Sequence, residues 1–181
     1  MTAIPPVSRL FIVALLAIVL APACQARTIS LDGASVDTYF SPDGGAAEAA
    51  ARIIDSARHR VLLASYTFNS TLIASALKRA HGRGLEVRVV LDASNLDSAY
   101  SGATFLANAG VDVRIDSRYP IMHSKFIVAD DLVALGSMNF TFSGDRKNAE
   151  NFNVFRGASL LADEYVSRFD GLYAESRPYT R

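Results

Sequence analysis

Apolar and polar positions divide most of the chain into segments of two kinds. Short apolar runs predict strands, and longer segments with apolar residues on one face predict helices. The predicted strands cover 36–40, 61–68, 85–91, 111–115 and 151–155, and the predicted helices cover 45–58, 70–81, 98–108 and 160–173. Because strands and helices alternate, the pattern is typical of an α/β fold. We predict a single-domain α/β sandwich in which a mixed central sheet is flanked by helices.

An apolar hairpin with polar ends follows the fourth predicted strand. His123 and Lys125 stand at its start, and Ser137 and Asn139 follow Gly136 at its end. Residues two apart on a strand point to the same face, so we expect the side chains of His123 and Lys125 to lie together. The apolar residues of the hairpin explain a buried pair of strands but not this polar set.

The residue types in this set fit a site for a phosphodiester. Attack on phosphorus needs a cation that neutralises the equatorial oxygens and a nucleophile that works near neutral pH, and Lys125 and His123 are such groups. Imidazole can attack in its neutral form and protonate a leaving oxygen in its charged form. Gly136 permits a close backbone approach, and Ser137 and Asn139 can donate hydrogen bonds to phosphate oxygens.

Three other residues bear on this site. Glu150 begins the strand after the hairpin and could orient an imidazole through its second nitrogen, although a solvated surface charge is the alternative. Asp130 stands in the hairpin turn, where aspartate is also common without any chemistry. Tyr119 precedes the hairpin and could stack on a base, although a packing role is more common. The other histidines, His59 and His81, have no comparable set of polar residues near them in the sequence, and they fit ordinary surface or core positions.

The first 26 residues have the pattern of a secretory signal peptide. One charge, Arg9, is followed by an apolar run and then by small residues that fit cleavage after Ala23 or Ala26. The apolar run is short for a bilayer span, so a permanent anchor is the weaker alternative, and Cys24 leaves a lipoprotein open. We expect a signal peptide over residues 1–26 and a periplasmic or secreted protein.

Length and charge limit what the rest of the chain can be. Residues 27–181 suffice for one core but not for two catalytic lobes. The chain has 18 basic and 18 acidic side chains, and removal of the leader would take away one arginine. A neutral protein does not favour tight binding through many phosphate contacts, but it can hold one or two phosphates locally. No metal-ligand spacing such as His-x-x-x-His is present, so we expect neither a metal nor another cofactor.

The motif resembles that of the phospholipase D superfamily, and more closely that of its small bacterial endonucleases with one motif copy per chain. The family pattern is His-x-Lys, four residues, Asp, six residues, and Gly-Ser-x-Asn. Here five residues separate Asp130 from Gly136, so Asp131 is an alternative equivalent of the aspartate. Further segments similar to that nuclease subgroup are 39–44, 64–68, 83–92, 136–141 and 148–151.

The resemblance implies a role for each matched residue. It implies that the catalytic residues are His123, Lys125, Asp130 and Glu150, and that the phosphate is bound by Lys125, Ser137 and Asn139. His123 would form a phosphohistidine, and Glu150 would hydrogen-bond this histidine. The superfamily uses two histidines per site, so one motif copy implies a homodimer with a shared active site.

The resemblance leaves the substrate open. Nucleic acid is the expected substrate, with DNA first and RNA second. A phospholipid head group is the alternative, because both substrates present a phosphodiester. A third hypothesis is a catalytically silent module that binds nucleic acid or the cell envelope, and its only support is the shortened turn before Gly136.

Overall fold

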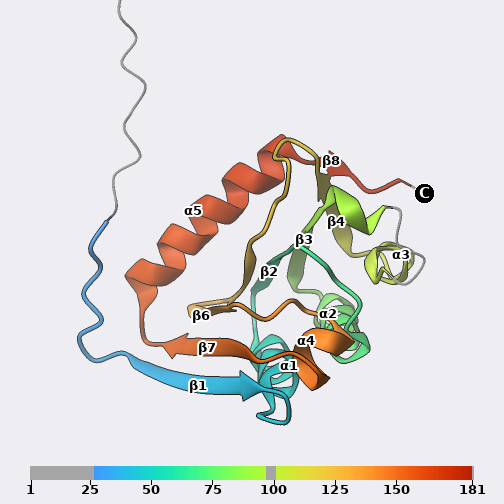
Figure 1. Ribbon diagram of the computed structural model, residues 1–181. Coiled ribbons are helices and arrows are strands. Elements are labelled where there is room, and N and C mark those ends of the chain that lie inside the picture. The colour runs from blue at the N-terminus through green and yellow to red at the C-terminus, as the bar shows by residue number, and fades with distance from the viewer. Residues whose placement is uncertain (1–26, 97–100, 181) are drawn as a thin grey trace, which may run out of the picture.

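The computed structural model describes residues 27–96 and 101–180, which form a central sheet with helices on both faces (Figure 1). The strands are β1 (Ser35–Ser41), β2 (Arg60–Ser65), β3 (Glu86–Asp92), β4 (Asp112–Asp116), β5 (Lys125–Ala129), β6 (Leu132–Gly136), β7 (Glu150–Arg156) and β8 (Arg177–Pro178). The helices are α1 (Ala46–Ser56), α2 (Thr71–Gly82), α3 (Ala103–Asn108), α4 (Phe142–Arg146) and α5 (Ser159–Glu175). A single 3-10 turn, Ala93–Asn95, follows β3.

The sheet is mixed, and its strand order is β1-β7-β6-β5-β2-β3-β4-β8. β2, β3 and β4 are parallel, and the remaining pairings are antiparallel. Helices α1, α2 and α3 pack on one face over a large apolar core. Helix α5 packs on the other face over a smaller core that contains Phe126, Val128 and Phe169. The predicted α/β sandwich with a mixed sheet is therefore confirmed.

Local signals in the sequence explain where several elements begin. The hydroxyl of Ser70 accepts a hydrogen bond from the backbone N–H of Ile73 at 3.3 Å, and this caps the start of α2 as expected. Thr141 caps the short helix α4 in the same way, through the N–H of Gly144 at 3.0 Å. The sequence pattern did not predict α4 because five residues are too few to show a helical period.

The observed elements differ from the predicted ones mainly at their ends. β2 ends at Ser65 instead of 68, and β5 begins at Lys125, so His123 precedes the strand. The helix expected over 98–108 begins at Ala103, and the start of that prediction lies outside the described residues. The predicted signal peptide also lies outside them. No helix within 27–96 and 101–180 has both the length and the apolar character needed to cross a membrane.

The topology brings the functional candidates to one edge of the sheet. β5 runs antiparallel to β2, so its first residue, Lys125, pairs with the last residue of β2, Ser65. β6 ends at Gly136 and β7 begins at Glu150, and these two ends meet because the strands are antiparallel. Lys125, Gly136 and Glu150 thus share the edge at which the parallel strands end, although 24 residues lie between Lys125 and Glu150 in the sequence.

One part of the sheet has an uncovered face. Helix α5 contacts β2 to β6, while β7 and β1 continue beyond it (Figure 1). On β1, Tyr39 points into the large core, so the alternate residues Val36 and Phe40 point to the face on which α5 lies. Val36 is 48% exposed and Phe40 is 64% exposed, and Val36 pairs with the partly buried Phe155 of β7. We call Val36, Phe40 and Phe155 the open sheet face.

Candidate active site

His123 is exposed at the site, and hydrogen bonds fix the backbone on either side of it. The N–H of Met122 donates a 2.8 Å hydrogen bond to Oδ2 of Asp92, a buried carboxylate at the end of β3. The carbonyl of Ser124 accepts a 3.1 Å hydrogen bond from the N–H of Tyr66. The imidazole lies against the ring of Tyr66, with the ring centroids 4.8 Å apart. The nucleophile candidate is therefore accessible but held in place.

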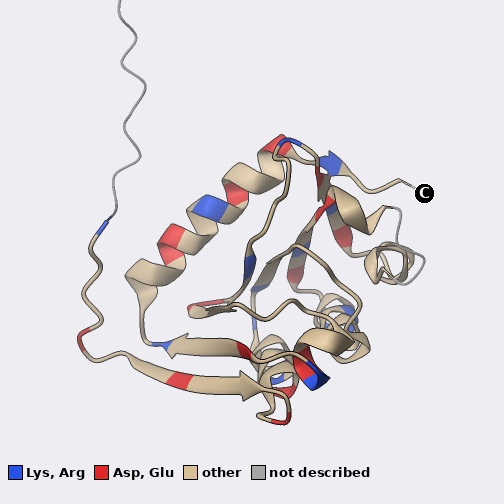
Figure 2. Cartoon of the chain, in the orientation of Figure 1, with Lys and Arg blue, Asp and Glu red and all other residues tan. Residues whose placement is uncertain are grey.

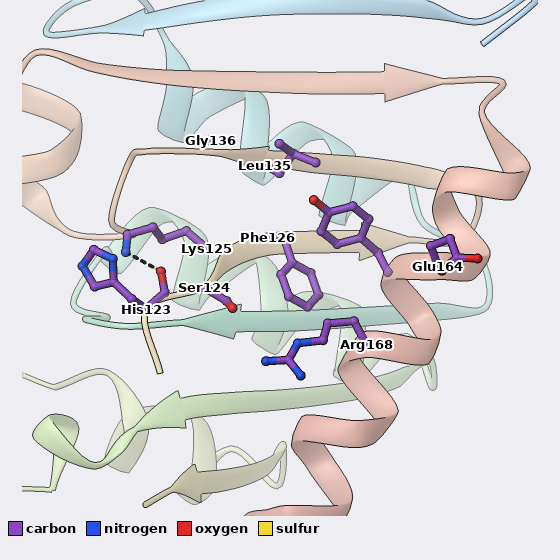
Figure 3. A pocket seen from close by; sticks show the side chains of 9 residues that line it. His123, Ser124, Lys125, Phe126, Leu135, Gly136, Glu164 and Arg168 are labelled. Atoms are coloured by element: carbon purple, nitrogen blue, oxygen red, sulfur yellow. Dashed lines mark hydrogen bonds between the residues drawn. The ribbon is translucent and has the colours of Figure 1, made fainter. Parts of the chain in front are cut away.

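Lys125 lies beside His123, as the spacing of the two residues predicted. Its Nζ donates a 2.7 Å hydrogen bond to the carbonyl of His123 and lies 5.4 Å from the centroid of the Tyr66 ring (Figure 3). The side chain is buried, and this burial lowers the pKa of its ammonium group, while the negative charge of Glu150 acts in the opposite direction. The side chains of His123 and Lys125 thus converge on one aromatic ring.

Ser137, Glu150 and Asn151 form a hydrogen-bond network next to this pair. The hydroxyl of Ser137 donates to Oε2 of Glu150 at 2.6 Å and accepts from the N–H of Asn151 at 3.0 Å. The side-chain oxygen of Asn151 accepts from the N–H of Ser137 at 2.7 Å. Asn148 donates to the other oxygen of Glu150 at 3.1 Å. These bonds fix the turn after β6 against the start of β7.

The position of Glu150 changes the expected role of this residue. Within the described chain, its carboxylate bonds Ser137 and Asn148, and no hydrogen bond joins it to His123. Within one chain, Glu150 thus bonds Ser137 and not the imidazole, and its hydrogen bond to a histidine stays a prediction for the site shared by two chains. Glu150 still acts on the site electrostatically, because its charge favours the protonated form of Lys125.

Asn139 and Gly136 complete the turn for different reasons. Oδ1 of Asn139 is buried and has no hydrogen-bond partner within the part of the chain that the structure describes. This oxygen accepts hydrogen bonds and does not donate them, so only the amide NH₂ group of the same side chain can bind a phosphate oxygen. A Cβ atom at Gly136 would lie 2.1 Å from the carbonyl oxygen of Asn151, so only glycine allows β7 to approach here.

Asp130 lies at the opposite end of β5 from His123, so the expected catalytic role is corrected. Its carboxylate accepts hydrogen bonds from the backbone N–H groups of Arg58 at 2.8 Å and of His59 and Arg60 at 3.0 Å. Burial raises the pKa of the carboxyl group, but these three hydrogen bonds outweigh that effect and hold the pKa below its ordinary value. Asp130 therefore joins the hairpin turn to the start of β2 and has a structural role.

Replacing Asp130 by alanine will lower the free energy of unfolding without removing activity. Three N–H groups lose their acceptor, and alanine must adopt the positive φ of 54° at this position, so we expect a loss of about 1–3 kcal/mol. Urea denaturation at neutral pH measures it, with Asp131→Ala as the neighbouring control. Because the folded-state pKa is lowered, this stabilisation is present above the unfolded pKa, and it is lost as pH falls through the folded pKa. A large loss of turnover in the folded variant would restore the catalytic assignment.

Replacing Lys125 by methionine will separate activity from stability. Loss of the cation should lower the turnover about 10²–10³-fold, as removal of a transition-state donor does. The fold should be at least as stable at pH 7, because methionine does not carry a buried charge. The lowered pKa means that the unfolded chain binds more protons in alkaline solution, so wild-type stability rises relative to the variant as pH approaches the ordinary lysine pKa. Denaturation at neutral and alkaline pH tests this, and a destabilised variant would contradict it.

The structure also identifies residues that the sequence pattern missed. The sequence placed Tyr66 in the strand over 61–68 and Asp92 at the start of a loop expected to border the substrate, but it predicted no role for either side chain. Asp116 is buried at the end of β4 and accepts hydrogen bonds from the N–H groups of Arg118 and Tyr119. It therefore holds the start of the loop that leads from β4 to His123. The available signal was a carboxylate that ends a buried strand, seen in both Asp92 and Asp116.

Acidic and imidazole groups are not clustered as metal ligands. Among residues 27–96 and 101–180, no group of three or more His, Cys, Asp or Glu side chains is placed to hold a metal ion. Lys125, a cation, occupies the centre of the polar set instead. Its position is consistent with electrostatic stabilisation of a phosphate by the protein itself.

Comparison with known proteins agrees with this geometry. The family model for "Cardiolipin synthase, PLD-like domain" matches residues 51–173. A phospholipase D of Rickettsia bellii is 38% identical over 140 residues, which are 77% of this chain and 69% of the relative. The mitochondrial cardiolipin hydrolase of Xenopus laevis is 34% identical over 125 residues, which are 68% of this chain and 59% of the relative.

A solved structure extends the similarity to the whole domain. Nuc from Salmonella typhimurium, described as a phospholipase D family member, has a TM-score of 0.78 and 32% identity, and the match covers 82% of this chain and 99% of Nuc. The α/β sandwich and the polar edge thus define a phosphodiesterase domain. The chain belongs to the phospholipase D superfamily.

Proposed function

We propose that the chain is a metal-independent endonuclease that cleaves DNA, and RNA as a second substrate, through a phosphohistidine intermediate. The observation that carries the proposal is the convergence of His123, Lys125 and the Ser137–Glu150 pair at one edge of the sheet. The segments that resemble the small nuclease subgroup support nucleic acid as the substrate. So does the match to nearly the full length of the compact protein Nuc.

In the proposed mechanism, two chains share one site. The imidazole of His123 forms a bond to phosphorus, and the bond from phosphorus to the leaving oxygen breaks. The partner's His123 gives a proton to that oxygen and then takes a proton from the water that cleaves the phosphohistidine. Lys125 and Asn139 of both chains stabilise the charge on the phosphate oxygens, and Ser137 assists them.

In this proposal, the open sheet face is the surface on which the second chain packs. The three residues that define this face are apolar, the polar Thr38 and Asn153 pair between them, and α5 does not cover it in the described structure. Phe40 lines a hollow together with Ser137, Glu150 and Asn151, so the end of the face adjoins the site. A two-fold interface is made of the same patch on each chain, and an interface here would bring the two polar edges together.

Hydrolysis of phospholipid is the second candidate function. It is favoured by the names of two relatives, a phospholipase D and a cardiolipin hydrolase. The polar set acts on a phosphodiester and does not distinguish the groups attached to it. We also propose export to the periplasm or the medium, on the basis of the leader over residues 1–26.

One experiment separates these functions. The protein without the leader and its His123→Ala variant are given plasmid DNA and phosphatidylcholine vesicles in parallel, with excess EDTA. The proposal expects DNA cleavage that persists in EDTA and is lost with His123. Choline release without DNA cleavage would identify a phospholipase. If neither substrate is cleaved, the hypothesis of a catalytically silent binding module would be favoured.

A further inference from the structure

A groove next to His123 is not used by the proposed chemistry. It has a volume of about 490 Å³ and runs between the β5–β6 pair and helix α5 (Figure 3). His123, Ser124 and Lys125 line one end, and Phe126 and Leu135 lie along the sheet side. A substrate held at His123 therefore has direct access to the groove.

The walls of the groove differ in chemical character. Phe126 and Tyr165 meet edge to face, with ring centroids 5.0 Å apart, and Leu135 extends this apolar surface. Arg168 reaches from α5, and its guanidinium is directed back toward the end that holds Ser124 and His123 (Figure 3). The groove thus combines an aromatic, apolar surface with the cations Lys125 and Arg168 and the carboxylate of Glu164.

Arg168 is the single basic residue of α5, which carries four acidic ones (Figure 2). Three of the acids have arginine partners on other elements: Glu164 bonds Arg27, Asp170 lies 3.1 Å from Arg88, and Glu175 lies 3.4 Å from Arg118. In the described part of the chain, Arg168 forms no ion pair. Its guanidinium lies 5.7 Å from the centroid of the Tyr119 ring, which leaves its hydrogen-bond donors open to an anion.

We propose that this groove binds the nucleotide next to the scissile phosphate, and that Arg168 binds the adjacent phosphodiester. The inference rests on the proposed nuclease function. A polynucleotide has an anion on each side of every nucleotide, and between these anions it has a base and a sugar that suit an aromatic surface. The groove offers the same groups, namely the phosphate site at His123, the apolar surface and the cation of Arg168, which faces back toward the phosphate site, while Glu164 lines the opposite end.

The test compares Arg168→Gln with the parent protein on two substrates. Thymidylyl-thymidine contains only the scissile phosphate, whereas a longer oligothymidylate also supplies the neighbouring one. We expect kcat/KM on the oligothymidylate to fall roughly tenfold and its salt dependence to weaken by about one counterion, with little change on the dinucleotide. Arg168→Lys should restore part of the loss. Arg52→Gln, an exposed arginine on α1 across the sheet, is the matched control.

Each other outcome overturns the inference. An equal loss on both substrates would show a general effect on the site, and no loss on either would show that the groove is unused. Loss of choline release from phosphatidylcholine vesicles, with oligothymidylate cleavage unchanged, would assign the groove to lipid. If the parent protein cleaves neither nucleotide substrate and leaves plasmid DNA intact, the nuclease function itself fails and the groove inference fails with it.

Discussion

Replacement of His123 by alanine will lower phosphodiester cleavage by roughly 10⁴-fold or more, because it removes the nucleophile and, in a shared site, the acid as well. The side chain is exposed and lies against the Tyr66 ring, and the backbone hydrogen bonds of Met122 and Ser124 do not depend on it. The fold should therefore be preserved. Initial rates on plasmid DNA, together with a thermal unfolding curve, measure both effects.

His59 provides the control for this experiment. It is also an exposed histidine, but it lies at the far end of the sheet, where its backbone N–H bonds Asp130. His59→Ala should keep full turnover. Alkaline quenching during the reaction should trap a phosphoryl group on His123 of the parent protein, because the nitrogen–phosphorus bond of the proposed intermediate is stable in alkali and labile in acid. Full activity of His123→Ala would end the proposed mechanism.

Mixing active and inactive chains will reveal whether two copies share one site. After joint refolding of equal amounts of parent and His123→Ala protein, only the pairs with two intact histidines should turn over rapidly. Activity should then fall to about a quarter of that of the parent alone, and not to the half expected of independent sites. A measured half would contradict the shared site.

Val36→Asp tests the surface on which this sharing depends. Val36 pairs with Phe155, near the end of β7 that is remote from Glu150, so the substitution leaves the polar edge intact. A buried, unpaired carboxylate opposes association, and we expect a folded monomer with most of the activity lost. Light scattering and initial rates over a range of concentrations measure this, with Leu72→Asp on α2 as the control. An active monomer would exclude the open sheet face as the required interface.

The Asp130 and Glu150 assignments show where sequence reasoning reached its limit. The motif implied a catalytic role for both residues. The spacing of residues along the chain, however, does not predict at which end of a strand a side chain lies. Asp130 follows β5 and Lys125 begins it, so a strand length separates them. Glu150 is distant in sequence but close in space, because β6 and β7 pair antiparallel and bring Gly136 to the start of β7.

The sequence by itself determined the α/β class, most of the strands, the capped start of α2, and the pairing of His123 with Lys125. These depend on local periodicity and on residues a few positions apart, which act within one element. The tertiary structure decided that Glu150 bonds Ser137, that Asp92 holds the backbone at Met122, and that α5 places Arg168 beside the site. Those relations depend on strand order and helix packing, which bring together residues that no local pattern connects.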